Sequence, residues 1–424
     1  MNKQITSNPA VQENILSNLQ NPAALEKLYR ADKSAFRLGF NALMPGLGNN
    51  PVAAFWQARL TAGRDEINWG SGRDLIRLIL VCLLAGLIAR IPFMLNLEED
   101  LFYARNIGFI VFPILTAYFA WKQKMAWPKV LEVYALIVAS AVFINALPKL
   151  EQSDTLVLSC IHLLLFLWSL LGYVFSQQEA QPREGRLAYL RYNGDLVVMG
   201  TLIAIAGAIL VAVSLGLFNL IGFMDQEKYM EYILPFALPA VPILGTYLTQ
   251  TNPQLVGRVS PVIAKIFSPL VLVMLAAYLL AIVYSGKNPY SDRDFLILFN
   301  VLLIGVMAII FFSIAETGRN GKQASGNWIL FLLALLTVMV NGIAISAILF
   351  RISSLGFTPN RTAVLGANLL MLVHLLIIII QLYRTISGKK DLSDVRNAIA
   401  QYLPVYVSWT IVVTFLFPFI FGFR

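Results

Sequence analysis

The stretch Asn327–Phe350, which reads NWILFLLALLTVMVNGIAISAILF, contains no Asp, Glu, Lys or Arg and decides the fold class of this chain. It is long enough to cross a bilayer, which takes ~20 residues as a helix. Because unpaired backbone amides are prohibitively costly in hydrocarbon, such a segment can only be a helix. The stretches Leu196–Met224 and Thr362–Tyr383 are also free of these charged residues. The sequence therefore predicts an all-α protein that spans the membrane many times.

The composition excludes a soluble domain. Hydrophobic residues make up 58% and charged residues 13% of the 424 residues, whereas a soluble domain has about 25% charged residues. The net charge of +9 does not indicate nucleic acid, because the basic residues lie in short loops and in the N-terminal segment. Such flanks are typical of contact with anionic lipid. Cys82 and Cys160 lie in apolar runs, so neither a metal site nor a disulfide is predicted, and no cofactor is expected.

The apolar runs predict about eleven spans and two regions of the chain. Residues 1–73 form a short cytoplasmic prefix, and residues 74–424 form the multispanning domain. The expected spans are 75–96, 107–121, 130–148, 155–176, 196–222, 231–249, 260–284, 295–315, 327–350, 362–384 and 404–423. The second run is short and the sixth contains prolines, so ten or twelve spans remain open.

The distribution of Lys and Arg predicts a cytoplasmic N-terminus and an outer C-terminus. With this orientation, thirteen basic residues fall in cytoplasmic loops, and seven, including Arg105, Arg351 and Arg361, fall in outer loops. Further basic residues precede the first span. An excess of basic residues on the cytoplasmic side is the usual rule.

The prefix is predicted to contain two short helices. Asn21-Pro22 and Asn50-Pro51 are each typical of a helix start, with an N-cap followed by proline at the first helical position. On the first helix one face is apolar and the other basic; the apolar face holds Leu25, Leu28, Phe36, Phe40 and Leu43, and the basic face holds Lys27, Arg30, Lys33 and Arg37. This pattern favours a helix that lies on the inner leaflet or docks onto cytoplasmic loops, over a surface for a cytoplasmic protein partner.

Polar residues inside the predicted spans gather in the outer half of the membrane. They are Arg90, Asn145, His162, Asn219, Asn300, Asn341 and Asn368. Such groups are costly without partners, so they should line a wet cavity or bond across helices. For any single asparagine, a hydrogen bond to a neighbouring helix is favoured over a position in the lining of a cavity. Arg90 is expected either to reach the outer interface or to bind a carboxylate or an anion.

Prolines and histidines give two further expectations. Pro235, Pro239 and Pro242 predict a sixth span that is broken or sharply bent, and a broken helix near the midplane exposes backbone groups that transporters use. His162 and His374 have no acidic residue at helical spacing, so they are predicted to be hydrogen-bonded core histidines rather than a proton relay.

The segment Arg351–Arg361, RISSLGFTPNR, with the apolar run Val364–Leu376 after it, resembles a motif of bacterial multispanning membrane proteins. That family is the domain of unknown function 4153, and the resemblance covers about a tenth of the chain. It implies a bacterial inner-membrane location and supplies no catalytic residues. Physically, Gly356 permits a tight turn, Thr358 or Asn360 can cap a helix, and Pro359 can start it. The loop is either a rigid hairpin with interfacial arginines or an anion-recognition site.

Three functional hypotheses follow. The first is a transporter or lipid-handling protein with an outward-facing polar cavity for an anionic lipid or solute, lined by Arg90, the outer-half asparagines and the 351–361 loop with Arg351, Asn360 and Arg361. The second is a non-catalytic scaffold or sensor whose prefix binds another protein. The third is a membrane-embedded transferase acting on a lipid-linked substrate, with Glu98, Glu99 or His162 near Arg90. The lack of a catalytic motif favours a function other than catalysis.

Overall fold

The computed structural model describes residues 9–47, 50–62, 70–149, 153–179, 181–220, 226–253, 259–285, 293–317 and 324–423. Every regular element in these residues is a helix. The chain divides into two compact units, Met1–Asn68 and Trp69–Arg424. This division lies close to the boundary predicted after residue 73.

The described part of the N-terminal unit contains four short helices, two more than predicted. They are α1 (Pro9–Ser17), α2 (Pro22–Ala31), α3 (Lys33–Leu47) and α4 (Pro51–Ala62). The side chain of Asn21 accepts a hydrogen bond from the Ala24 amide at 3.1 Å, and that of Asn50 accepts one from the Val52 amide at 2.9 Å. Both predicted helix starts are therefore confirmed.

The apolar face of the prefix is directed into this unit and not toward lipid. Leu25, Phe36 and Phe40 are buried. They belong to one core with Ile15 of α1 and Trp56 of α4. The expectation of a helix lying on the leaflet is therefore wrong, because α1 and α4 cover the face that lipid would have covered.

The second unit is the membrane unit, and its helices follow one another with short connections. They are α5 (Gly72–Ala89), α6 (Ile91–Met94), α7 (Glu99–Lys122), α8 (Trp127–Ala146), α9 (Asp154–Phe175), α10 (Pro182–Leu220), α11 (Gln226–Thr251), α13 (Val259–Ser285), α14 (Arg293–Thr317), α15 (Ala324–Leu355), α16 (Pro359–Ile386), α17 (Leu392–Ile411) and α18 (Phe417–Ile420). A 3-10 turn, Ser176–Gln178, follows α9, and a π-helical stretch, Val412–Leu416, joins α17 to α18.

Nine helical segments in the described part of the chain are long and apolar enough to cross a membrane. They are α7 to α11, α14, α15, α16 and the run from α17 to α18. The other two predicted spans correspond to α5, which carries Arg73, Asp74 and Arg77 near its start, and to α13, whose described apolar stretch Ile266–Leu280 is shorter. The protein is thus a helical, multi-pass membrane protein.

Several helices begin earlier than predicted, α10 at Pro182 by the largest margin, and one predicted break is not present. Helix α7 begins at Glu99, so Arg105 lies on a helix and not in a loop, and α17 likewise begins at Leu392. Helix α11 continues without interruption past Pro235, Pro239 and Pro242, so the sixth span is not broken there, and the sharp bend that the prolines equally predict stays a prediction. The prolines are four and three residues apart, so the hydrogen bonds they remove fall on one side of the helix while the other side of the ladder continues.

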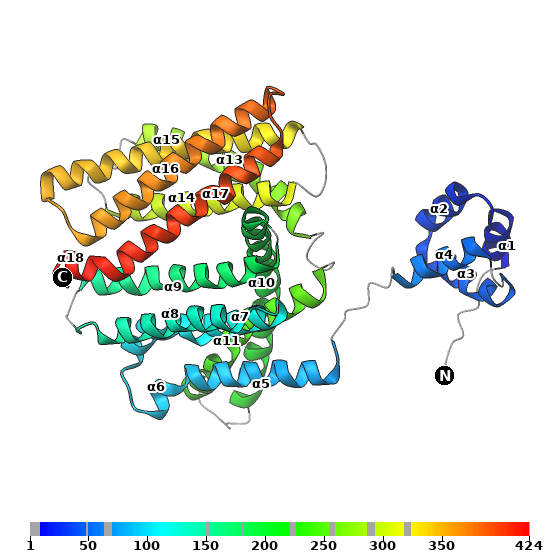
Figure 1. Ribbon diagram of the computed structural model, residues 1–424, viewed down its shortest axis with the longest axis horizontal. Helices are drawn as coiled ribbons and strands as arrows, with labels where there is room; N and C mark the ends of the chain where they lie inside the picture. Colours follow the sequence, from blue (N-terminus) through cyan, green and yellow to red (C-terminus); the bar gives the residue numbers. More distant parts are fainter. Residues whose placement is uncertain are drawn as a thin grey trace. The chain divides into compact units, whose positions relative to one another are not determined.

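Among its described residues, the membrane unit has two large apolar cores, which meet along α9, and two smaller clusters. One core lies among α5 and α7 to α11, around Phe119, and the other lies among α13 to α17, around Phe299. Figure 1 shows the α13–α17 group above α9 and the α5–α8 group below it. At the junction, Ser159 Oγ donates to the main-chain oxygen of Thr414 at 2.9 Å.

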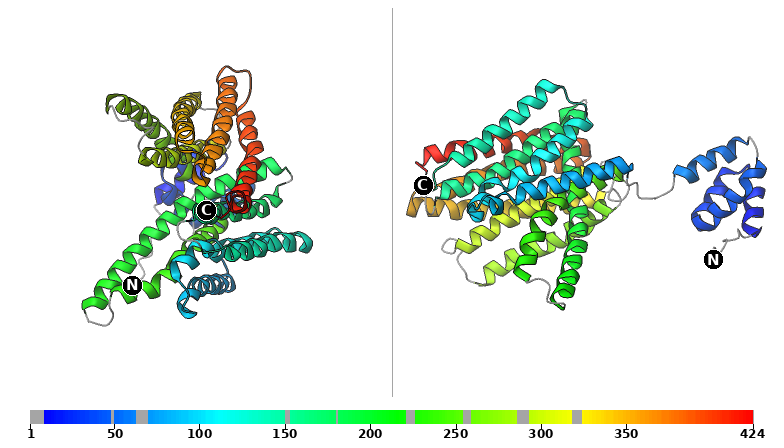
Figure 2. Two further views of the ribbon diagram at one scale, coloured as in Figure 1. Left: turned by 90° about the vertical axis from the view of Figure 1, so that its left-hand side faces the viewer. Right: turned by 90° about the horizontal axis from the view of Figure 1, so that it is seen from below.

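Helices α10 and α11 form an antiparallel pair that runs across the direction of α9. In Figure 1, α9 lies in the plane of the view while part of α10 is seen nearly end-on, and Figure 2 shows the pair from two further sides. The apolar part of α10 is mostly exposed, as at Leu202 and Leu210. This pair therefore offers much of its length to lipid.

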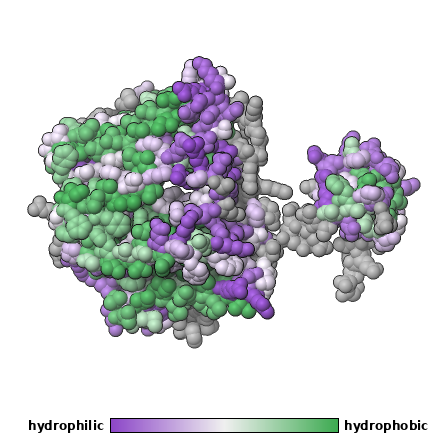
Figure 3. Space-filling model, in the orientation of Figure 1, coloured by the Kyte–Doolittle hydropathy of each residue, from purple (hydrophilic) through white to green (hydrophobic). Residues whose placement is uncertain are grey.

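The surface of the membrane unit is apolar over most of the face in view. Leu131 on α8 is 72% exposed, and Val273 on α13 is 67% exposed. Figure 3 shows that hydrophilic residues of this unit gather at the end where α5 begins and α16 ends. An apolar surface of this size is typical of helices that face hydrocarbon.

Candidate functional site

Two asparagines lie against each other between α15 and α16, well inside both helices. The side chains of Asn341 and Asn368 are fully buried. Asn341 Nδ2 donates to the main-chain oxygen of Asn368 at 3.0 Å. Asn341 Oδ1 and both polar atoms of the Asn368 side chain have no hydrogen-bond partner among the described residues. The structure thus brings together two of the predicted site residues.

His374 lies further along α16 in an aromatic surrounding. Its Nδ1 is 3.1 Å from the hydroxyl of Tyr406, and its ring stacks on Tyr402 with centroids 4.4 Å apart. The ring of Phe311 on α14 is 4.8 Å away. His374 is fully buried, and its Nε2 has no partner in the described part of the chain. His374 is therefore a buried core histidine, as expected, but only its Nδ1 is hydrogen-bonded among the described residues.

We refer to Asn341, Asn368, His374, Tyr402 and Tyr406 together as the polar core, which consists of two separate groups, the asparagine pair and His374 with its two tyrosines. The two tyrosines were not predicted as site residues, although their spacing of four residues puts them on one face of α17. A buried polar group without a partner costs about 1–3 kcal/mol. The polar core combines donors and acceptors without a permanent charge. It is therefore suited to an uncharged hydrogen-bonding group, and no group of three or more His, Cys, Asp or Glu able to hold a metal occurs in the described residues.

Arg90 is held by aromatic rings. It ends α5, and its guanidinium carbon lies 4.0 Å from the ring centre of Tyr232 on α11 and 4.6 Å from that of Phe93. Its contacts among the described residues are therefore with aromatic rings, and the carboxylate partner, one of the expected alternatives, is not among them. The short α6 that follows Arg90 and the turn between α15 and α16 lie at opposite edges of one end of the unit (Figure 1). The structure does not bring Arg90 to the 351–361 loop.

Asn145 and His162 are engaged in local hydrogen bonds. The side-chain amides of Asn145 and Asn106 bond to each other in both directions, at 3.1 and 2.8 Å. Arg105 is buried beside them and donates to the main-chain oxygens of Asn145 and Leu147 at the end of α8. His162 Nδ1 lies 2.9 Å from the main-chain oxygen of Leu158 on its own helix. These groups tie α7 to α8 and stabilise α9.

The residues named for a transferase do not converge. Glu98 forms an ion pair with Lys149, in which both side chains are more than half exposed. Glu99 begins α7, and His162 lies on α9 with its hydrogen bond to that helix. Neither Glu98 nor His162 contacts Arg90 in the described interactions.

The turn between α15 and α16 is built as a helical hairpin. Gly356 has a positive φ of 76°, Thr358 caps α16 by accepting from the Arg361 amide at 3.3 Å, and Pro359 is the first helical residue. These three roles were predicted. Arg361 Nη1 donates to the main-chain oxygens of Leu355 and Gly356, at 3.0 and 2.8 Å. It thereby caps the carboxyl end of α15, which accounts for its side chain without a bound anion.

The other predicted site residues lie apart. Arg351 and Asn360 are half-buried near the turn, and Asn300 is half-buried on α14. The side chain of Asn219 lies outside those that the structure describes. The nine predicted site residues whose side chains the structure describes lie in several separate places, and Asn341 and Asn368 are joined by their hydrogen bond between α15 and α16.

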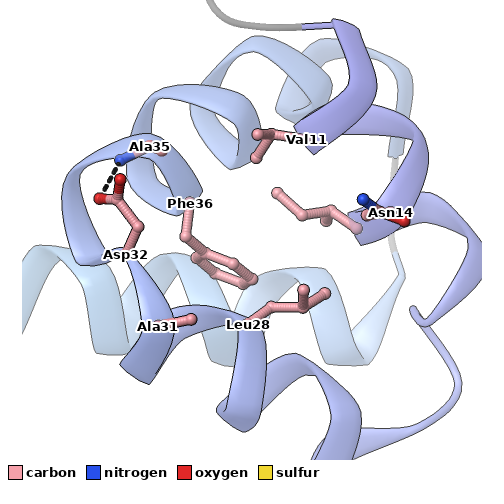
Figure 4. A pocket seen from close by; sticks show the side chains of 8 residues that line it. Val11, Asn14, Leu28, Ala31, Asp32, Ala35 and Phe36 are labelled. Carbon is pink, nitrogen blue, oxygen red and sulfur yellow. Dashed lines mark hydrogen bonds between the residues drawn. The ribbon is translucent and has the colours of Figure 1, made fainter.

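The N-terminal unit has a small pocket of its own, of about 140 Å³. Figure 4 shows its mostly apolar lining, which consists of Val11, Asn14, Ile15, Leu28, Ala31, Asp32, Ala35 and Phe36. Asp32 is engaged, because its Oδ1 accepts a hydrogen bond from the Ala35 amide at 3.0 Å at the start of α3. The pocket therefore offers apolar contact more than polar recognition.

Comparison of the chain with protein-family models, with curated proteins and with solved structures found no match.

Proposed function

We propose that this protein is a membrane transport protein in which the polar core handles a small polar solute. One observation carries the proposal: Asn341, Asn368 and His374 are fully buried inside a membrane-spanning bundle and keep polar atoms without partners. Polar groups at membrane depth are costly and mark solute pathways when they are retained. The outward-facing cavity expected from Arg90 and the loop is not needed for this function.

We place the protein in a bacterial cytoplasmic membrane with eleven spans, the N-terminus inside and the C-terminus outside. The resemblance of the 351–361 segment to the domain of unknown function 4153 family supports the location. The excess of basic residues in alternate loops supports the orientation. The same orientation puts the hydrophilic end of the unit, where α5 begins and α16 ends, on the cytoplasmic side (Figure 3).

A scaffold or sensor function is the second candidate, and one observation favours it. The N-terminal unit has its own core and an apolar pocket between α1, α2 and α3. Such a unit suits contact with an apolar side chain of a cytoplasmic protein. On this alternative the polar core would serve packing alone and would stay closed to water.

Accessibility of the polar core separates the two candidates without knowledge of the solute. In a protein with Cys82 and Cys160 replaced by serine, the substitution Asn368→Cys introduces a thiol into the core. We expect this thiol to react with a membrane-impermeant reagent, since a transport protein must open its site to water. The control is Ile378→Cys, which is equally buried in the apolar core of the same helix and should stay unreactive.

Equal protection of both thiols, from either side of the membrane, would exclude transport through the polar core. The orientation of the protein in the membrane is tested separately with a reporter fused to the C-terminus. A C-terminal reporter active only in the cytoplasm would contradict the proposed topology.

A further inference from the structure

Asn341 and Asn368 present a defined set of unused hydrogen-bonding atoms. They are two carbonyl oxygens, Asn341 Oδ1 and Asn368 Oδ1, and one amide nitrogen, Asn368 Nδ2. The bond from Asn341 Nδ2 to the Asn368 main chain, 3.0 Å long, fixes one amide beside the other helix. The pair therefore offers two acceptors and one donor group within a small volume.

The surroundings of the pair disfavour an ion as its ligand. The stretches Asn327–Phe350 and Thr362–Tyr383, which carry the two asparagines, contain no Asp, Glu, Lys or Arg. Val340 and Ala344 on α15 and Met371 on α16 are buried in the same apolar core. An ion at this depth needs a counter-charge or a hydration shell, and these helices supply no counter-charge.

We infer that the Asn341–Asn368 pair binds a small uncharged solute that carries both a hydrogen-bond donor and an acceptor, of the amide or polyol type. This inference rests on the proposed transport function and adds the class of solute. Both side chains are fully buried, so the solute reaches them only when α15 and α16 separate. Binding then satisfies atoms that the closed conformation leaves without partners, which favours the occupied state.

Stability provides the first arm of the test. Replacing Asn368 by Leu removes unpaired polar atoms and keeps a side chain of similar size, so we expect a higher melting temperature of the purified protein. The control is Asn145→Leu, which breaks the reciprocal amide bonds with Asn106 and should lower the melting temperature. Asn368→Ser, which also removes the amide, serves as a second variant.

Flux provides the second arm. Proteoliposomes with the wild-type protein should take up urea or glycerol several-fold faster than protein-free liposomes, as measured by light scattering after an osmotic step. Asn368→Leu and Asn368→Ser should both return the rate to the protein-free level. Potassium and acetate, which are charged, should pass at the protein-free rate in every sample.

Three results would overturn the inference. One is urea and glycerol flux that is unaffected in both variants, and another is flux of potassium or acetate that depends on Asn368. The third is loss of folding in both variants, which would assign the pair to structure. If the Asn368→Cys thiol reacts while neither urea nor glycerol flux depends on Asn368, the solute class is wrong and the transport proposal stands.

Discussion

Arg90 illustrates at the residue scale how a cation can be accommodated at the end of a membrane helix. Its guanidinium lies over the rings of Tyr232 and Phe93. The faces of aromatic rings carry negative potential and attract a cation without requiring a carboxylate. The contact with Tyr232 also joins the end of α5 to α11, so Arg90 contributes to the packing of these helices.

A double-mutant cycle measures this contact. We expect Arg90→Leu and Tyr232→Leu to show a coupling free energy of about 0.5–2 kcal/mol in the thermal unfolding of the purified protein. Tyr232→Phe is the control, because it keeps the ring face and should retain most of the coupling. Purely additive effects of the two Leu substitutions would show that Arg90 is held by its apolar stem alone.

At the scale of elements, α11 shows that three interior prolines can be accommodated in one continuous helix. Each proline removes one main-chain donor, so the oxygens of Glu231, Pro235 and Leu238 lose their usual partners. These oxygens lie on the side of α11 that carries the prolines. Packing against α5 and α10 holds the helix together in spite of this loss.

Replacing Pro239 by Ala tests how much stability the missing hydrogen bond costs. Pro239 is buried inside α11, and Ala restores a donor to the oxygen of Pro235. We expect a gain of about 1 kcal/mol in stability, measured as a higher melting temperature.

Pro359→Ala is the matched control, because Pro359 is the first residue of α16 and its amide would have no helical partner. It should change the melting temperature little. A clear fall for Pro239→Ala would indicate that α11 needs the bend a proline introduces.

The helices could be predicted from local composition. The contacts between helices could not, because they depend on long-range packing. The apolar runs located the spans because crossing hydrocarbon requires a long apolar stretch in each helix. Their ends were missed at Glu99 and Leu392, because charged residues such as Arg105 and Arg396 continue the helix beyond the hydrocarbon. The contact of Arg90 with Tyr232 depends on which helices are neighbours, and no local pattern contains that information.

The same limit applies to the candidate site. The asparagines were found because they interrupt apolar runs. That Asn341 meets Asn368 while Asn145 meets Asn106 follows from the pairing of α15 with α16 and of α7 with α8. Tyr402 and Tyr406 were missed because tyrosine is common on membrane helices, and its contact with a histidine on another helix leaves no mark in the sequence.

At the scale of the whole molecule, the chain combines two units with different sources of stability. The N-terminal unit has a core of its own and a surface ion pair, in which Glu26 contacts Arg30 at 2.8 Å and Arg59 at 2.7 Å. The hydrogen bond from Arg30 is the main cause that lowers the pKa of Glu26. Its carboxylate therefore stabilises the unit above the usual carboxyl pKa range, and this contribution is lost as the pH falls through the lowered pKa.

Melting of a fragment comprising residues 1–68, followed by circular dichroism, tests this pH dependence. We expect Glu26→Gln to melt slightly lower than the wild type at about pH 7 and the difference to be smaller at about pH 3, because the carboxylate contribution is lost as the pH falls through the lowered pKa. Glu13→Gln on α1 is the control, since Glu13 has no ion pair among the described residues, and it should change little at either pH. An equal difference between Glu26→Gln and the wild type at both pH values would attribute the effect to packing.

The tight turn between α15 and α16 has a consequence for biosynthesis. Only residues 356–358 separate the two helices, so the second helix follows the first into the bilayer before the first can move away. An asparagine in an isolated helix would meet lipid during insertion, at a cost. Here Asn341 and Asn368 enter the membrane already opposite each other, so each shields the other from the lipid. We therefore expect the hairpin, and not the single helix, to be the unit in which this part of the chain is inserted.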